Sequence, residues 1–294
     1  MCGWKERHMA KGVPKVLSLQ DMSCAGRCSL TAVLPVMAAC GVEAVPLPTA
    51  VFSNHLAFPF EEHVDFTPYM EGFMDAWDRN GLTFDAVYSG FLASPEQIHL
   101  VEEAIRRYGR AGGLVMIDPA MADNGRLYSL YTPAMVEAMR HLMGRAAVVK
   151  PNYTEACLLA GKPYKPEAVP GDEELMDLVE GLPAGPEWII MTSVPAGREL
   201  RNLVYHRKTG RMGEILFPRL PLRTFGTGDM FCAVVTALFV KGVPMEKAAR
   251  KATEFLTESI EDTIASGGKS VEGIIFEKRL LELAAFAACE GEKG

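Results

Sequence analysis

Short apolar runs alternate with longer amphipathic stretches over the first two thirds of the chain. The apolar runs carry no charge and are predicted strands, covering residues 16–19, 44–48, 86–89, 114–117, 147–149 and 188–191. Between them lie predicted helices, each followed by a glycine placed to end it, which cover residues 30–40, 68–80, 95–108, 133–143 and 153–160. Strands that are apolar on both faces belong to a sheet covered on both sides, so the pattern predicts an α/β protein.

The pattern changes beyond residue 191. Two short apolar runs flank Lys208, Thr209 and Gly210, which are typical of a hairpin turn, so we expect an antiparallel edge to the sheet. Two long helical stretches follow and are predicted to finish the chain. The two strands cover residues 203–206 and 214–217, and the two helices cover residues 230–241 and 245–265.

Composition and charge narrow the class of protein. The 294 residues are 49% hydrophobic and carry a net charge of −7, which predicts a large core and no basic surface for nucleic acid. The chain has neither an apolar stretch of about 18 residues nor a signal-peptide pattern at its start, so no membrane span and no export are expected. Seven cysteines without disulfide-scaffold or zinc spacing are typical of reduced thiols in a cytoplasmic protein. We expect one domain over residues 1–294, with a flexible arm at residues 1–13.

The strongest chemical signal is the segment Gly226-Thr227-Gly228-Asp229, which directly precedes the predicted helix 230–241. Two glycines allow the backbone to turn tightly, and the free N–H groups of the first helical turn then form a site for an anion. Taken alone, an aspartate at this position is more often an ordinary helix cap than a catalytic group.

Two further polar segments follow predicted strands. Asn152 and Glu155 come after the strand at residues 147–149, and Asp118 follows the strand at residues 114–117. Open α/β sheets bind their ligands at the carboxyl ends of strands. Without more context, Asn152 and Glu155 are equally explained as a capping box, and Asp118 is explained as the residue that closes a turn.

In this order along the chain, the three segments resemble the ribokinase-like family of carbohydrate and vitamin kinases. The resemblance implies a three-layer α/β/α fold with a mostly parallel central sheet and an antiparallel edge. It also implies phosphoryl transfer from ATP, with Asp229 as the general base and Gly226, Thr227 and Gly228 as the anion hole. Such a site supplies the positioning and charge stabilisation on which phosphoryl transfer depends.

The same resemblance assigns the nucleotide side of the site. Residues implied to bind ATP are Lys150, Asn152, Glu155, Thr192 and Ser193, and those implied to hold Mg²⁺ and its waters are Asp118 and Glu155. Many pyridoxal kinases carry a threonine beside a bound monovalent cation where this chain has Lys150. A lysine ammonium can replace such a cation, whereas the alternative is a side chain that extends to solvent.

The first third of the chain resembles the pyridoxal kinase branch of this family. The segments that carry the resemblance are Leu19-Gln20 with Gly26, Phe52-Ser53-Asn54-His55 and Ser89-Gly90-Phe91. Four side chains are implied to contact the substrate, namely Thr49, Phe52, His55 and Phe91. The implied substrate is a B6 vitamer, and a homodimer is implied by resemblance as well.

Two departures from that branch bear on the substrate. Asp21 stands where many pyridoxal kinases have a serine that hydrogen-bonds the ring, and Leu56 stands where they have a threonine. An ionised carboxylate accepts hydrogen bonds but does not donate them, so Asp21 favours a protonated ring nitrogen or a cationic amine. The alternative for Asp21 is a structural ion pair with Arg27.

We therefore predict ATP-dependent phosphorylation of the hydroxymethyl group of pyridoxal, pyridoxamine or pyridoxine. The alternatives are a hydroxymethylpyrimidine or sugar kinase of the same fold, and a non-catalytic regulator that binds a vitamer or a nucleotide. Because Asp229, Asn152 and Glu155 are all present, an enzyme is favoured over the regulator.

Overall fold

The computed structural model describes residues 12–109 and 113–291. In that part of the chain, nine strands form one sheet in the order β11-β10-β9-β8-β5-β4-β1-β2-β3. Six central strands are parallel, whereas β3 at one edge and β10 and β11 at the other run antiparallel to their neighbours. The strands are β1 (Lys15–Ala25), β2 (Glu43–Asn54), β3 (His63–Asp65), β4 (Ala86–Ser89), β5 (Leu114–Ile117), β8 (Val148–Val149), β9 (Trp188–Ala196), β10 (Glu199–His206) and β11 (Arg211–Pro218).

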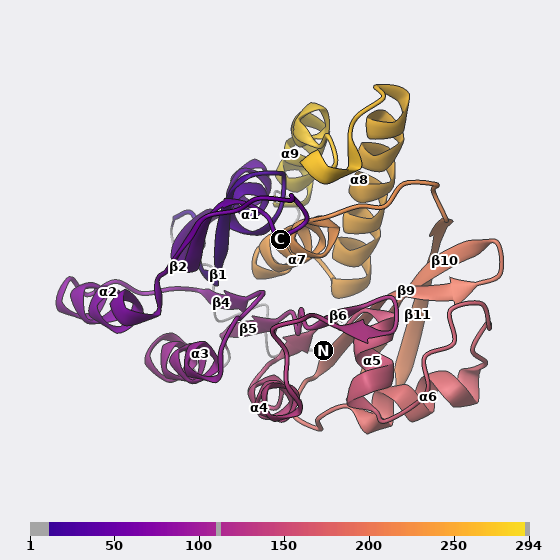
Figure 1. Ribbon diagram of the computed structural model, residues 1–294, viewed down its shortest axis with the longest axis horizontal. Helices are drawn as coiled ribbons and strands as arrows, with labels where there is room; N and C mark the ends of the chain where they lie inside the picture. The colour runs from indigo at the N-terminus through magenta and orange to yellow at the C-terminus, as the bar shows by residue number, and fades with distance from the viewer. Residues whose placement is uncertain (1–11, 110–112, 292–294) are drawn as a thin grey trace.

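Helices cover both faces of this sheet (Figure 1). On one side lie α2 (Thr67–Arg79), α3 (Pro95–Tyr108), α4 (Pro133–Met143), α5 (Tyr153–Leu159) and α6 (Asp172–Gly181). On the other side lie α1 (Ser29–Ala39), α7 (Thr227–Val240), α8 (Met245–Ala265) and α9 (Leu280–Gly291). A short hairpin of β6 (Ala122–Asp123) and β7 (Arg126–Leu127) and two 3₁₀ turns complete the described elements.

Successive residues of the central strands belong to different cores. Leu17 and Leu19 of β1 pack with the helices of the first side, whereas Val16 packs with those of the second. This arrangement follows from the two-residue period of a strand, and it requires strands that are apolar on both faces. The predicted three-layer α/β/α fold is confirmed.

The apolar pattern located most elements and missed others. Every predicted strand and helix is present, but β1 and β2 extend well beyond their apolar runs because their backbones stay paired as far as Ala25 and Asn54. The prediction that two helices finish the chain is wrong, since α9 follows α8; the sequence also did not indicate α6 or β3. Two of the expected terminating glycines, Gly109 and Gly144, have φ of −72° and −62° and need no left-handed conformation.

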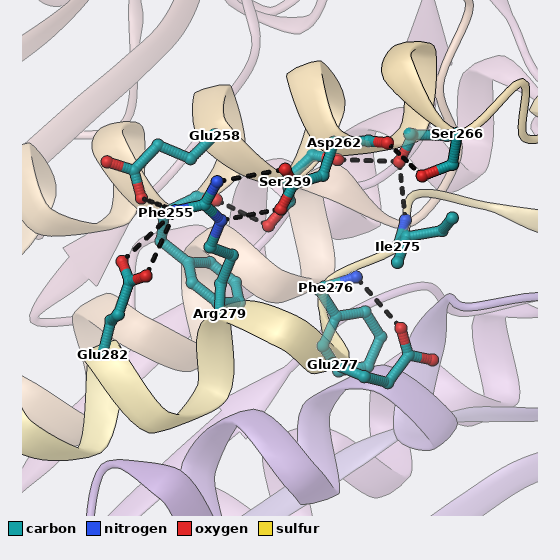
Figure 2. A network of polar contacts seen from close by, with 11 residues as sticks. Phe255, Glu258, Ser259, Asp262, Ser266, Ile275, Phe276, Glu277, Arg279 and Glu282 are labelled. Carbon is teal, nitrogen blue, oxygen red and sulfur yellow. Dashed lines mark hydrogen bonds and ion pairs between the residues drawn. The ribbon is translucent and has the colours of Figure 1, made fainter.

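Arg279 fastens the start of α9 to α8 (Figure 2). Its guanidinium binds Asp262 through two nitrogens, at 2.7 and 3.1 Å, and also pairs with Glu258 and Glu282. A planar guanidinium matches a carboxylate in this two-bond geometry. The alanine-rich helix α9 then buries Leu283 and Ala287 against the second core.

None of the helices in the described part of the chain has the length and apolar character that a membrane crossing needs. The expected single domain stays a prediction, and residues 1–11 of its expected arm lie outside the described residues.

Candidate active site

The candidate residues gather at the carboxyl ends of the parallel strands, where α7 also begins. Asp118 directly follows β5, and Lys150 directly follows β8. Asp21 lies in the last part of β1, and Asp229 lies in the first turn of α7. Because parallel strands end at the same edge of a sheet, residues far apart in sequence meet here.

Gly226 starts α7 and brings it against the start of α1. Its φ is +76°, a left-handed value that favours glycine, and a Cβ at this position would lie 2.1 Å from the carbonyl oxygen of Arg27. Among the described residues no side chain caps α7, so the N–H groups of its first turn are available to an anion. The geometry fits the anion hole expected of Gly226, Thr227 and Gly228.

Asp229 is the third helical residue of α7 and does not cap it. Its Oδ2 accepts a hydrogen bond of 2.7 Å from the backbone N–H of Ser29, which belongs to α1. The interpretation of Asp229 as an ordinary cap of its own helix is therefore wrong.

The surroundings of Asp229 hold its pKa near neutrality. Burial raises the pKa to about 7, and the carboxylates of Asp118 and Asp21 act in the same direction, whereas the Ser29 N–H and Lys150 oppose them. A carboxylate that titrates near pH 7 is well matched to removing a proton from a hydroxyl group.

Lys150 and Asp118 form a buried ion pair beside this helix start. Lys150 Nζ lies 2.8 Å from Asp118 Oδ2, and the two residues are only 4% and 2% exposed. Burial is the largest influence and lowers the pKa of Lys150, but the charge and hydrogen bond of Asp118, together with Cys232 and Glu155, outweigh it and the pKa is raised. A Cβ on Gly228 would lie 3.0 Å from Lys150 Nζ, which places the ammonium against the glycine loop. The alternative of a solvent-exposed lysine is wrong.

Asn152 and Glu155 form the capping box of α5. Glu155 N–H donates to Asn152 Oδ1 at 2.9 Å, and Asn152 N–H donates to Glu155 Oε2 at 2.7 Å. Glu155 Oε1 also accepts the N–H of Met121 at 3.0 Å. Burial and then Asp118 raise the pKa of Glu155 to about 8. Oε1 accepts a second N–H as well, from Ala122 at 3.4 Å. The capping interpretation is confirmed, and it leaves a role toward the nucleotide open because Oε2 accepts a single hydrogen bond and keeps a further lone pair.

Thr192 and Ser193 lie beside Asn152. Thr192 N–H donates to the Pro151 carbonyl at 3.0 Å, and Thr192 is paired with Asn152 in a parallel bridge. Ser193 has a φ of +60°, and its N–H donates to Asn202 at 3.1 Å. The pair does not end β9, as the sequence suggested, because that strand continues past a bulge to Ala196.

The acidic groups suit a magnesium ion that keeps most of its water. The described residues contain no cluster of three or more potential ligands among His, Cys, Asp and Glu. Asp118 nevertheless has a buried Oδ1 with no partner among those residues, which is an available hard oxygen ligand. Asp118 and Glu155 therefore fit Mg²⁺ bound mainly through water and phosphate oxygens.

Asp21 is buried between two serines. Its Oδ1 accepts from the Ser29 hydroxyl at 2.7 Å, and its Oδ2 accepts from the Ser23 hydroxyl at 2.9 Å. Burial is the largest influence on its pKa, which is raised, and the two hydroxyl groups oppose that shift. Arg27 instead binds Glu277, with its Nε 2.6 Å from the carboxylate, so the proposed ion pair between Asp21 and Arg27 is wrong.

The expected substrate contacts flank the end of β1. Phe52 lies on β2 opposite Ser23, and Phe91 follows β4, which pairs with β1 from the other side. Asp21 therefore lies on the strand between these two aromatic residues. Thr49, also on β2, is buried.

His55 ties the end of β2 to the glycine loop. Its Nδ1 accepts the N–H of Ala57 at 3.2 Å, so Nε2 carries the proton and donates to the Val271 carbonyl at 2.6 Å. The ring centroid lies 4.9 Å from that of Phe225. A Cβ on Gly26 would lie 2.2 Å from this imidazole, so the close approach requires glycine.

Ser29 contacts both Asp21 and Asp229, and the sequence did not indicate a role for it. It donates its N–H to Asp229 and its hydroxyl to Asp21, and it does so with a φ of +51°. An unusual backbone angle at a serine leaves no mark in a pattern of apolar and polar residues.

Fold and site together define an ATP-dependent small-molecule kinase of the ribokinase-like class. A family model for phosphomethylpyrimidine kinase matches residues 20–273. The chain belongs to that family, and its relatives make it a pyridoxal kinase-like phosphotransferase.

Two relatives illustrate the range of substrates within the family. A pyridoxine/pyridoxal/pyridoxamine kinase of Bordetella bronchiseptica is 30% identical, over 86% of this chain and 90% of its own. A hydroxymethylpyrimidine/phosphomethylpyrimidine kinase of Rhizobium meliloti is 25% identical, over 83% of this chain and 89% of its own.

Solved structures of similar proteins contain a vitamer or a nucleotide. A Bacteroides thetaiotaomicron protein, provisionally described as a phosphomethylpyrimidine kinase and crystallised with pyridoxal, is 37% identical with a TM-score of 0.86, covering 92% of this chain and 96% of its own. A pyridoxal kinase of Leishmania donovani in complex with ADP and ginkgotoxin is 26% identical with a TM-score of 0.77, covering 92% of this chain and 95% of its own.

Proposed function

We propose that this kinase transfers the γ-phosphoryl group of ATP to the hydroxymethyl group of a B6 vitamer. The observation that carries the proposal is the setting of Asp229. Its carboxylate has a pKa of about 7, lies in the first turn of a helix that no side chain caps among the described residues, and is linked to the buried Asp21 by hydrogen bonds from Ser29. This arrangement combines a base, an anion site and a ring-recognition group within one short network. The pyridoxal bound to the Bacteroides relative and the ADP bound to the Leishmania relative support the choice of both substrates.

In this mechanism each group has one task. Asp229 accepts the proton of the substrate hydroxyl, and the N–H groups of residues 226–228 stabilise the charge on the phosphoryl group. Lys150, held by Asp118 against the glycine loop, adds a fixed positive charge beside the phosphates. The rest of the ATP molecule is contacted by Asn152, Glu155, Thr192 and Ser193. Mg²⁺, held by Asp118 and Glu155 through its waters, would neutralise phosphate charge when bound.

On the vitamer side, Phe52 and Phe91 contact the two faces of the ring, while Thr49, His55 and Asp21 surround its edge. Asp21 accepts a hydrogen bond from a protonated ring nitrogen or a cationic amine. We infer from this acceptor that pyridoxamine is used at least as well as pyridoxal.

The second candidate substrate is a hydroxymethylpyrimidine. It is favoured by the family of the chain and by Asp21, because an aminopyrimidine also presents hydrogen-bond donors to an acceptor.

A coupled assay of ADP formation with pyridoxal, pyridoxamine, pyridoxine, hydroxymethylpyrimidine and a hexose tests these functions, with products identified by mass spectrometry. We expect a phosphorylated vitamer as the main product. A pyrimidine or sugar phosphate as the main product would select the alternative kinase. Binding of a vitamer without turnover of any substrate would identify a regulator.

We also propose a cytoplasmic homodimer formed by one domain. The edge strand β3, the loop before it and the adjacent α2 carry four exposed apolar side chains. They are Phe60 in the loop (87% exposed), Val64 on β3 (59%), and Tyr69 (56%) and Phe73 (42%) on α2, and a second copy can cover them by pairing β3 with its own β3. Light scattering should give a molar mass twice that of one chain, and the Val64→Lys variant should have the molar mass of a single chain. Four buried cysteines that are free support a reducing compartment.

A further inference from the structure

Ser29 occupies a position between the two carboxylates of the site that no catalytic or binding role yet explains. Its N–H donates to Asp229 Oδ2 at 2.7 Å, and its hydroxyl donates to Asp21 Oδ1 at 2.7 Å. The residue is buried, so these two hydrogen bonds are shielded from competing water. One residue therefore contacts both the group expected to meet the substrate ring and the group expected to take its proton.

The backbone of Ser29 is held in an unfavourable conformation. Its φ of +51° lies in the left-handed region, which is disfavoured for a residue with a Cβ. Strain of this kind persists only where surrounding contacts impose it. The hydroxyl bond to Asp21 is the contact that holds this side chain, and the left-handed turn is what aims the N–H at Asp229.

The start of α1 depends on these contacts. Cys28 at its N-cap makes no side-chain cap bond, and the first turn of α1 contains no acidic residue. The carboxylate of Asp229, which belongs to α7, therefore caps α1 from outside. Gly226 lies close against the Arg27 carbonyl, so the two helix starts are adjacent, and the bond from the Ser29 N–H to Asp229 links them.

We propose that Ser29 is a positioning residue that couples Asp21 to Asp229, so that a substrate ring held at Asp21 finds the base already oriented. The inference rests on the proposed function, because it assumes that Asp229 accepts the hydroxyl proton. When a hydrogen-bond donor of the substrate ring binds Asp21, it restricts the motion of Asp21, Ser29 and Asp229 together.

Three variants test this coupling by steady-state kinetics. Ser29→Ala loses the hydroxyl that holds residue 29 in its strained conformation, so the backbone relaxes and turns its N–H away from Asp229. We therefore expect kcat to fall about 10-fold with little change in the KM for ATP. Ser29→Gly also loses the hydroxyl but adopts a positive φ without strain, so kcat should fall only about 3-fold. In Asp21→Ala the serine has lost its partner, and adding Ser29→Ala should reduce kcat no further, as expected for residues that act as a unit.

Thr132→Ala is the matched control. Thr132 is likewise a hydroxyl residue at a helix start, where it accepts the N–H of Met135, and it lies at the start of α4. It should lower the melting temperature and leave kcat unchanged. Equal kcat values for Ser29→Ala and Ser29→Gly, additive losses in the double variant, or a melting shift with unchanged kcat would each overturn the coupling.

A crystal structure of Ser29→Ala tests the coupling without any turnover. We expect the Asp229 carboxylate to move away from the N–H of residue 29, beyond hydrogen-bond distance. Retention of the 2.7 Å contact would overturn the inference even if the unmodified protein phosphorylates a vitamer. An inactive unmodified protein would instead contradict the proposed function, so the two failures are distinguishable.

Discussion

At the scale of single residues, Asp229 is both desolvated and fixed in its direction. Its carboxylate is desolvated, which raises the pKa to about 7, yet it keeps one strong hydrogen bond from Ser29 that fixes its direction. A base of this kind is partly ionised near pH 7 and is basic enough to accept a hydroxyl proton.

The first prediction concerns the pH profile of this base. We expect kcat/KM to fall with decreasing pH below about 7, because protonated Asp229 no longer accepts a proton. Asp229→Asn keeps an oxygen for the Ser29 N–H, so it should fold and bind ATP while losing about 10²–10⁴-fold in kcat. The measurement is kcat/KM from pH 5.5 to 9 for both proteins. Near-normal turnover in the folded variant would remove Asp229 from the mechanism.

The second prediction concerns Asp21 and the choice between vitamers. Asp21→Ser replaces an acceptor by a group that also donates, so the ratio of kcat/KM values should move from pyridoxamine toward pyridoxal. The shift should amount to about 1–3 kcal/mol, or roughly 5- to 150-fold, as for one hydrogen bond to a charged group. Initial rates with both vitamers give the ratio. An equal loss for both substrates would leave Asp21 as a scaffold residue only.

At the scale of elements, the site depends on how closely α7 approaches α1. Gly226 is in contact with the Arg27 backbone, and Gly26 makes equivalent room for His55. Backbone cannot move aside as a flexible side chain does, so Gly226 sets the distance between the two helix starts.

The third prediction tests that distance with two glycines of similar φ. Gly226→Ala should lose more than about 2 kcal/mol of stability and about 10²-fold in kcat, because its Cβ meets backbone. Gly210→Ala has a φ of +66° but open space around it, so it should cost about 1 kcal/mol and leave kcat unchanged. Urea denaturation and steady-state kinetics provide both quantities. Equal effects of the two substitutions would show that strain, and not the contact, matters at Gly226.

The fourth prediction concerns the ammonium group of Lys150, which follows β8 and lies against the glycine loop. If Lys150 does the work of a bound monovalent cation, the unmodified enzyme should depend little on potassium. Lys150→Thr should lose about 10²-fold in kcat and become activated by potassium. The test is the initial rate against potassium concentration at constant ionic strength. Strong potassium activation of the unmodified enzyme would contradict this role, because the site would then still take up a free ion.

At the scale of the whole molecule, the site weakens the fold that carries it. The folded-state pKa of Asp229 lies above its ordinary value of 3.8, so the ionised carboxylate opposes folding. This penalty is absent well below pH 4, grows as the pH rises toward 7 and is complete above that value. A desolvated base is therefore maintained at the expense of global stability.

The fifth prediction follows from this destabilising effect of ionised Asp229. Asp229→Asn removes the penalty and should raise the free energy of unfolding at pH 8 by about 1–3 kcal/mol, with a smaller gain at pH 5. Urea denaturation of both proteins at the two pH values, without nucleotide or metal, measures the difference. A variant that is equally stable at pH 8 would show that Asp229 is well solvated.

The sequence by itself determined the layers of this protein and the identity of its reactive groups. Short apolar runs without charge are typical of strands buried on both faces, and short motifs such as Gly226 to Asp229 carry chemistry that depends on local backbone geometry. Two of the elements it missed depend on partners in other elements: β3 pairs with β2, and α9 is joined to α8 through Arg279 and Asp262. The apolar positions of α6, which are Leu175, Leu178 and Val179, do have helical spacing and were not recognised.

Only the tertiary structure decided how those groups are used. It showed that Asp229 caps α1 and not α7, that Lys150 is paired with Asp118, and that Ser29 joins Asp21 to Asp229. These relations arise because parallel strands end at one edge and bring residues from β1, β5, β8 and α7 within a few ångströms of each other. Hydrogen bonding and desolvation depend on those distances, which no local pattern of residues contains.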